Sequence, residues 1–300
     1  MDDMNKTQGG AAEMPEPSLT YFEVEGEPDI VKEVRRRVID EFDDLEFYEA
    51  DHRYILHGKQ LDSVSGISHR FESKSFDCDS QARSYANKHG GTPEYWKRVW
   101  ACNSFRATTL GTKTHAFGES LGYVRVGHPE LINSLVSKQY NAQYDYLAPI
   151  HKSEEAAELF FNELPPSYHL VLNEARVYSG KNPDSSKNLK EQICGTFDML
   201  YYYDGEGDES KAGFVIMDFK TNAKLCSEYN QQRGITFLPP FDDMIQEEIG
   251  GYTMQLSLYA LMLEDIGINI INRYIIWLKA DGAYEKIPVQ DVSDRLRNVL

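Results

Sequence analysis

The sequence predicts a mixed α/β fold in which helices flank a central sheet. Three observations predict it: a group of apolar strand-like segments, a long amphipathic helix after them, and two more strand-like segments after that helix. The first strands are expected at 170–178, 193–203 and 213–220, the helix at 252–266, the later strands at 270–278 and 283–289, and a last helix at 291–300. Strands that precede and follow a helix in this way form one sheet of mixed direction, with a helix on each face.

The chain before residue 166 is predicted to be mainly helical. Helices are expected at 31–44, 78–126 and 129–163, with a strand at 47–56. Gly58 and Lys59 suit a turn after that strand, and Ser63 or Ser65 suits the cap of a following helix. Pro93 suits the start of another helix. Gly111 is expected to interrupt it, because glycine is a poor helix former, so that a separate helix follows.

Composition divides the chain into three parts. Residues 1–30 hold eight acidic residues against one lysine, with glycine and proline among them, and are predicted to be a disordered acidic tail. Residues 31–165 form the mainly helical region, and residues 166–300 form the core that contains the sheet. We expect residues 31–300 to fold as one compact domain. The long connection 222–250 is typical of a functional or mobile loop.

Composition also argues against several classes of protein. No apolar run approaches the roughly 20 residues that cross a membrane, and the acidic N-terminus does not fit a secretory signal. The four cysteines are scattered and form no Cys-x-x-Cys pair, which argues against a disulfide framework, a zinc site or an iron–sulfur cluster. We therefore expect an intracellular protein, either cytoplasmic or, if viral, in the host cell or its nucleus. The net charge of −17 argues against broad, passive nucleic-acid binding.

Two acidic residues and a lysine at strand ends indicate a chemistry. Asp218 and Lys220 are two residues apart on an apolar strand, so their side chains leave the same face. Asp198 ends the preceding apolar strand, and the two carboxylates converge if these strands form a hairpin. Carboxylate oxygens suit Mg²⁺ or Mn²⁺, and a neighbouring lysine can hold a water for phosphodiester hydrolysis. The alternative is that these are ordinary charged strand ends.

A longer series of motifs resembles a known family. In chain order the motifs are Gly111-x-x-x-His115, Glu174, Gly195-x-x-Asp198, Asp218-x-Lys220-Thr221 and Gln255-x-x-x-Tyr259. This series resembles the PD-(D/E)xK nuclease superfamily, and within it the RecB-like exonuclease branch, over residues 45–280. The segments 51–67 and 238–241 are also similar to phage or viral nucleases. The resemblance implies a restriction-endonuclease-like core.

The resemblance implies roles for individual residues. The implied ligands of Mg²⁺ or Mn²⁺ are His115, Asp198, Asp218 and the backbone carbonyl of Phe219. Lys220 is implied to orient the attacking water, and Glu174 to be a catalytic-site acid. Gln255 and Tyr259 are implied to position the lysine or a DNA phosphate. Glu119 lies one helical turn after the histidine and is either a further site acid or a surface ion-pair residue.

A basic segment lies beside the Gly-x-x-x-His motif. Residues 81–118 carry six lysines and arginines against one glutamate, a net charge of +5 (six minus one). The six are Arg83, Lys88, Lys97, Arg98, Arg106 and Lys113. Phosphate binding needs only a local positive surface, so this segment is predicted to contact DNA, with Thr221 and Tyr252 as further phosphate neighbours. The alternative is an ordinary solvated helix face.

These expectations describe a metal-dependent deoxyribonuclease, an exonuclease acting on DNA ends or single strands in replication, recombination or repair. Two alternatives stay open, an endonuclease or nickase of the same fold and a non-catalytic protein that binds nucleic acid or another partner. No Gly-x-x-x-x-Gly-Lys-Ser/Thr run is present in the sequence. Any unwinding of DNA is therefore expected to need a partner, such as a helicase or a recombination protein.

Overall fold

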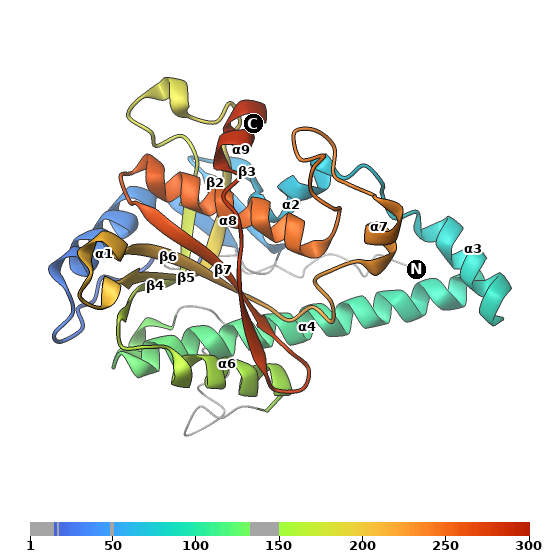
Figure 1. The fold of residues 1–300 in the computed structure, drawn as a ribbon, viewed down its shortest axis with the longest axis horizontal. Helices are drawn as coiled ribbons and strands as arrows, with labels where there is room; N and C mark the ends of the chain where they lie inside the picture. Colours follow the sequence, from blue (N-terminus) through green and yellow to red (C-terminus); the bar gives the residue numbers. More distant parts are fainter. Residues whose placement is uncertain (1–14, 17, 49–50, 133–149) are drawn as a thin grey trace, which may run out of the picture.

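The computed structural model describes residues 15–16, 18–48, 51–132 and 150–300, and their strands join in one mixed sheet surrounded by helices (Figure 1). The strands are β1 (Leu45–Tyr48), β2 (Arg53–Leu56), β3 (Lys59–Ser63), β4 (Tyr168–Tyr178), β5 (Ile193–Tyr203), β6 (Gly213–Lys220), β7 (Ile270–Leu278) and β8 (Tyr284–Pro288). Their order is β1-β2-β3-β5-β6-β7-β8, and β4 pairs with β5. The β3–β5 and β6–β7 pairs are parallel and the others antiparallel. The predicted mixed α/β fold is confirmed.

Helices cover the sheet in two groups. The helices are α1 (Asp29–Phe42), α2 (Val64–Ile67), α3 (Cys78–His89), α4 (Pro93–Arg125), α6 (Lys152–Glu163), α7 (Glu228–Arg233), α8 (Glu248–Asp265) and α9 (Ser293–Val299), with 3₁₀ turns η2 (Ser68–Phe71), η3 (Pro129–Leu131), η4 (Ser185–Lys187), η5 (Gly205–Gly207) and η6 (Glu209–Lys211). In Figure 1, α8 lies above the strands, while α4 and α6 lie below them and pack on each other. α8 also contacts α9, α2 and η2, so it is buried on almost every side rather than on the single face of an amphipathic helix.

Strand β5 has two successive partners along one edge. Ile193 and Cys194 pair with β3, whereas Met199–Tyr203 pair with β6. Between these pairings β3 and β6 diverge from each other, and the short segment that ends at Asp198 lies at this fork. Asp198, predicted to end its strand, therefore lies in the middle of β5. A strand segment placed between two diverging neighbours leaves room for side chains from other elements, and the candidate site is built there.

Helix α4 runs unbroken through Gly111, so the predicted interruption is wrong. The glycines of this helix serve packing instead. A Cβ atom on Gly118 would lie 2.4 Å from the ring of Phe219, and one on Gly122 would lie 2.3 Å from the side-chain amide of Asn173. The absence of Cβ atoms lets α4 lie directly against β6 and β4, which offsets the helix-propensity cost of about 1 kcal/mol per glycine.

The region before residue 166 contains more strand than predicted. The strand expected at 47–56 is a hairpin of β1 and β2, and Lys59, expected in a turn, begins β3. Because β3 pairs with β5, this region belongs to the same sheet as the later strands. Of the helix expected at 129–163, only η3 and α6 fall in the described part, and residues 133–149 lie outside it.

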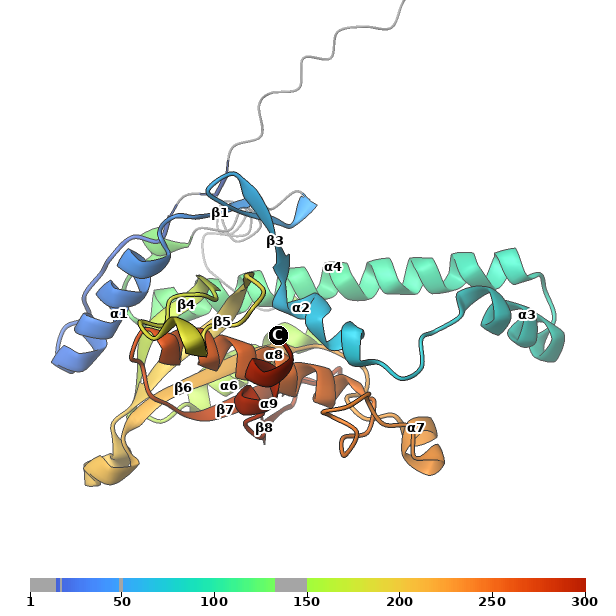
Figure 2. The same ribbon diagram turned by 90° about the horizontal axis from the view of Figure 1, so that it is seen from above.

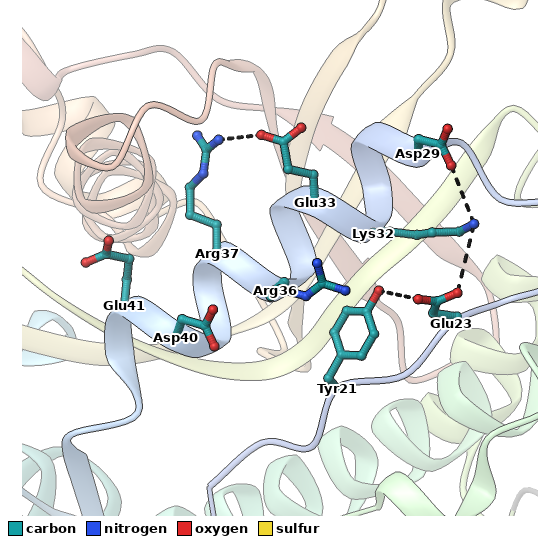
Figure 3. A pocket seen from close by; sticks show the side chains of 9 residues that line it. All are labelled: Tyr21, Glu23, Asp29, Lys32, Glu33, Arg36, Arg37, Asp40 and Glu41. Atoms are coloured by element: carbon teal, nitrogen blue, oxygen red, sulfur yellow. Dashed lines mark hydrogen bonds and ion pairs between the residues drawn. The ribbon is translucent and has the colours of Figure 1, made fainter.

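The segment before α1 also belongs to the fold. Phe22 is buried, and the carboxylate of Glu27 accepts two hydrogen bonds of 2.7 Å from Arg35, whose side chain is fully buried. On the outer face of this region, Tyr21 donates a hydrogen bond of 2.8 Å to Glu23 (Figure 3). The disordered tail predicted for residues 1–30 is therefore wrong from Phe22 onward, and residues 1–14 and 17 lie outside the described residues.

The close approach of α4 to β6 predicts the effect of Gly118→Ala. The new methyl group would overlap the ring of Phe219, which is buried and packed edge-on against Phe160 and Phe161, so the ring has no free space to enter. Overpacking of this kind costs about 1–3 kcal/mol, and we expect a lower urea midpoint. Gly66→Ala in α2 is the matched control, because nothing lies within 4 Å of its added Cβ. Equal stability of the two variants would contradict the packing role.

Candidate metal centre

Three predicted site residues from three different elements meet at the fork. His115 of α4, Glu174 of β4 and Asp198 of β5 each offer one ligand atom, and these atoms lie within 4.8 Å of one another. The Nδ1 atom of His115 is 3.1 Å from Oδ2 of Asp198. One imidazole nitrogen with two carboxylates is a donor set that suits Mn²⁺ and accommodates Mg²⁺. The residues present therefore fit the divalent cation that the sequence predicts.

Asp198 is held in its ionised form. Its Oδ2 atom accepts a 2.7 Å hydrogen bond from the backbone N–H of Phe219 and faces His115. Burial opposes ionisation of Asp198, but His115, Lys220 and the Phe219 N–H together outweigh it and lower the pKa of this carboxyl. Burial opposes protonation of His115 in turn, and the carboxylate of Asp198 outweighs this effect and raises the pKa of His115. The carboxylate is thus ready to bind a cation.

Asp218 and Lys220 form an ion pair, as their spacing on one strand predicts. The carboxylate is buried: Oδ2 faces the lysine, whereas Oδ1 has no hydrogen-bond partner among the described residues. Burial and the charge of Asp198 raise the pKa of Asp218 to about 6, although Lys220 and His115 oppose them. Asp218 lies outside the group of three ligands, but its unsatisfied buried oxygen is a position that a cation or a proton would stabilise.

Glu174 enters the group through an unusual backbone conformation. Its φ angle is +48°, in the left-handed region that non-glycine residues seldom adopt, and β4 has a register shift between Leu170 and Leu172. Such a conformation costs of order 1–3 kcal/mol and is found preferentially at functional sites. Burial, together with the charges of Asp198 and Glu119, raises the pKa of Glu174 well above its usual value.

Lys220 is held by Tyr252 as well as by Asp218. Its Nζ atom lies 4.5 Å from the centre of the Tyr252 ring, and the hydroxyl of that tyrosine donates a 2.8 Å hydrogen bond to Asn222. Asn222 is fixed in turn by Trp277, whose indole N–H donates to its backbone carbonyl at 2.8 Å. Burial opposes the charge on Lys220, but Asp218 and Asp198 outweigh it and raise the pKa of the lysine. The ammonium group is therefore charged and oriented.

Sequence reasoning assigned this positioning role to other residues. Gln255 donates a 3.2 Å hydrogen bond to the hydroxyl of Tyr259, and that hydroxyl would lie 2.9 Å from a Cβ on Gly195. These two residues therefore set the packing of α8 on β5 just before Asp198. Within the described residues, the recorded partners of Lys220 are Asp218 and Tyr252, so contact of the lysine with Gln255 or Tyr259 is not observed. The contact between Lys220 and the Tyr252 ring joins segments that are far apart in the sequence, so no motif spacing predicts it.

The other predicted residues lie at different distances from the centre. Glu119 is buried, which excludes the surface ion-pair alternative, and its charge acts on Glu174. Thr221 lies beside α4, with its hydroxyl 3.5 Å from the place of a Cβ on Gly111. The N–H of Phe219 binds Asp198, and a ligand role for its carbonyl stays a prediction. The basic residues lie along α3 and α4, N-terminal to His115: Arg83, Lys88, Lys97, Arg98, Arg106 and Lys113.

Comparisons with known proteins add no family assignment. A search against protein-family models finds no match, and a search of curated proteins finds no matching sequence. In the part of the chain that the structure describes, no helix combines the length and apolar character needed to cross a membrane. The resemblance to PD-(D/E)xK nucleases therefore rests on the motifs themselves and stays a prediction.

The raised pKa of Glu174 predicts a pH-dependent stability change in Glu174→Gln. The folded chain takes up a proton at Glu174 that the unfolded chain lacks, so stability falls as pH rises from the ordinary value of 4.5. In EDTA, the variant should be at least as stable as the wild type at pH 8, and the difference should vanish near pH 4. Thermal denaturation of the variant and the wild type measures the stability difference at each pH, with exposed Glu209→Gln as control. Added Mn²⁺ should stabilise the variant less than the wild type, and equal Mn²⁺ stabilisation would exclude Glu174 as a ligand.

The raised pKa of Asp218 predicts how cation binding depends on pH. Metal binding displaces protons from its ligands, and burial together with the charge of Asp198 raises the pKa of Asp218 to about 6. Below that pH the affinity for Mn²⁺ should fall about tenfold per pH unit for each proton displaced. Calorimetric titration between pH 5 and pH 8 measures this slope. Asp218→Asn should show weaker binding and a shallower slope, and an unchanged slope would show that Asp218 is not coupled to the cation.

Proposed function

We propose that this chain is a metal-dependent deoxyribonuclease that hydrolyses phosphodiester bonds at DNA ends or in single strands. The observation that carries the proposal is the convergence of His115, Glu174 and Asp198 beside the buried Asp218–Lys220 pair. One ion-binding group next to one oriented ammonium is the arrangement that phosphodiester hydrolysis needs. The motif series that resembles PD-(D/E)xK nucleases supports the same activity.

The side chains have distinct parts in this proposal. His115, Glu174, Asp198 and Asp218 hold Mg²⁺ or Mn²⁺, which when bound neutralises charge on the phosphate and makes a water more acidic. Lys220 donates its N–H groups to the attacking water and to a phosphate oxygen, where negative charge develops. Tyr252 and Asp218 hold the lysine in place for this role. Attack in line with the 3′ oxygen, which leaves, gives a 5′-phosphate.

The energetics of the site favour catalysis over passive binding. Glu174 and Asp218 both have raised pKa values because desolvation and the neighbouring carboxylates disfavour their ionised forms, and Glu174 also has a strained backbone. Each feature destabilises the folded chain, which supports a functional role for this group of residues. Clusters of perturbed carboxylates around a lysine are characteristic of catalytic sites.

Cleavage of end-labelled DNA tests the proposal. With Mg²⁺ or Mn²⁺, the wild type should degrade linear DNA and leave closed circles intact, whereas cutting of circles would establish an endonuclease or nickase instead. Asp218→Asn and Lys220→Ala should lower the rate by about 10²–10³-fold or more, because each removes a group that acts on the reacting phosphate. Exposed Asp40→Asn on α1 is the matched control and should retain the wild-type rate. Absence of metal-dependent cleavage of every DNA would overturn the proposal.

A further inference from the structure

A groove lies beside the proposed catalytic lysine. Its volume is about 1030 Å³, and Tyr252 and Gln255 at the start of α8 form part of its lining. Its other walls come from the segment between α2 and α3 and from α7 with its flanking loops. Tyr252 also contacts Lys220, so the groove and the metal centre share a wall. A substrate chain lying in the groove would therefore reach the proposed site.

Two exposed aromatic rings line this groove. The side chain of Phe76 is 71% exposed and that of Tyr229 is 50% exposed, which is unusual for large rings in a folded protein. Two cations contact Tyr229: Lys74 Nζ is 5.2 Å from its ring centre and donates a 3.4 Å hydrogen bond to its hydroxyl, and the guanidinium carbon of Arg233 is 4.6 Å from the ring centre. A ring flanked by cations can stack on a base while the cations contact the neighbouring phosphates.

The aromatic surface continues from the groove along a projecting arm. Figure 2 shows α3 and the N-terminal part of α4 extending away from the rest of the molecule. The rings of Phe76 and Trp100 are 6.0 Å apart, those of Trp100 and Tyr85 5.7 Å, and those of Tyr85 and Trp96 4.7 Å. Beyond Trp100, every residue of 101–108 is exposed, so no other described element covers this part of α4. Trp96 and Trp100 are half-buried and Tyr85 is exposed, so the arm offers a series of partly accessible rings that begins at the groove.

The charges of the arm and the groove are arranged differently. Residues 78–113 carry six basic and two acidic residues, a net charge of +4 (six minus two), in a chain of net charge −17. Among the described residues, only Lys97 of these six forms an ion pair, with Asp79 at 2.9 Å. The groove, in contrast, is lined by four glutamates (Glu72, Glu228, Glu247 and Glu248) and two lysines (Lys74 and Lys224), a net charge of −2 (two minus four). Phosphates are therefore attracted to the arm more strongly than to the groove, where the cations at the Tyr229 ring are the groups that can contact them.

We propose that the groove and the arm bind single-stranded DNA, with bases stacked on Tyr229 and Phe76 and phosphates against the free cations of the arm. A duplex exposes phosphates on its outside and keeps its bases stacked inside, so it matches neither the acidic groove nor the bare rings. A single strand turns its bases toward the rings and its phosphates outward. That the bound nucleic acid is DNA rests on the proposed function, whereas the rings and charges of this surface indicate that it is single-stranded.

Binding in EDTA separates this proposal from catalysis. The full chain is titrated onto a fluorescent thymidine oligonucleotide and onto a hairpin-closed duplex, and anisotropy gives both affinities. Tyr229→Leu and Phe76→Leu should each weaken single-strand binding by roughly 5- to 150-fold, because a stacked base contributes about 1–3 kcal/mol. Tyr229→Phe keeps the ring and should bind like the wild type. A 2-aminopurine base in the strand should be quenched by the wild type and by Tyr229→Phe, but less by Tyr229→Leu.

The chain contains a matched control for the ring beside a cation. Tyr21 lies on the α1 side of the molecule, with the guanidinium carbon of Arg36 4.7 Å from its ring centre, almost the distance between Arg233 and Tyr229 (Figure 3). Tyr21→Leu should leave DNA binding unchanged. Equal affinity of Tyr21→Leu and Tyr229→Leu for the single strand would overturn the proposal that the groove binds single-stranded DNA. Duplex binding as tight as single-strand binding would overturn it as well. Ring-dependent binding without any metal-dependent cleavage would support the groove and overturn the proposed nuclease function.

Discussion

The site depends on one carboxylate that joins three elements. Asp198 lies in the middle of β5, accepts a hydrogen bond from the Phe219 N–H of β6 and faces His115 of α4. The helix comes this near because Gly118 lies directly against the Phe219 ring. A side chain at that glycine would push the helix outward and carry the histidine away from Asp198. One packing contact therefore controls three things: how the strands diverge, how close the helix comes, and where the candidate ligands lie.

The same packing gathers negative charge in a place where water cannot stabilise it. Glu174 and Asp218 lie close to Asp198, so each raises the free energy of the ionised forms of its neighbours. One histidine and one lysine compensate only part of this charge. The remainder is a local instability that a divalent cation would remove, and binding would then stabilise the folded chain by mass action. Phe160 and Phe161 of α6 pack edge-on against Phe219 of β6, and this close packing holds the strand that carries Asp218 and Lys220.

Charge is distributed unevenly over the molecule, and this distribution links the candidate metal centre to the arm. The chain as a whole repels phosphate, whereas the exposed cations of α3 and α4 form a local positive surface. The continuous α4 carries both features, since its N-terminal half is the arm and its C-terminal half bears His115. Under the proposed function, one helix therefore guides the substrate and supplies a ligand.

The sequence by itself determined the strands whose apolar runs are bounded by polar loops, and β5, β6 and β7 begin and end where it predicts. It also determined the Asp218–Lys220 pair, because alternation along a strand is a local property. Only the tertiary structure decided that Gly111 lies within a continuous helix, that β3 joins β5 and that Tyr252 holds Lys220. Each of these depends on contacts between segments far apart in the chain, and local periodicity carries no information about which distant segments pack together.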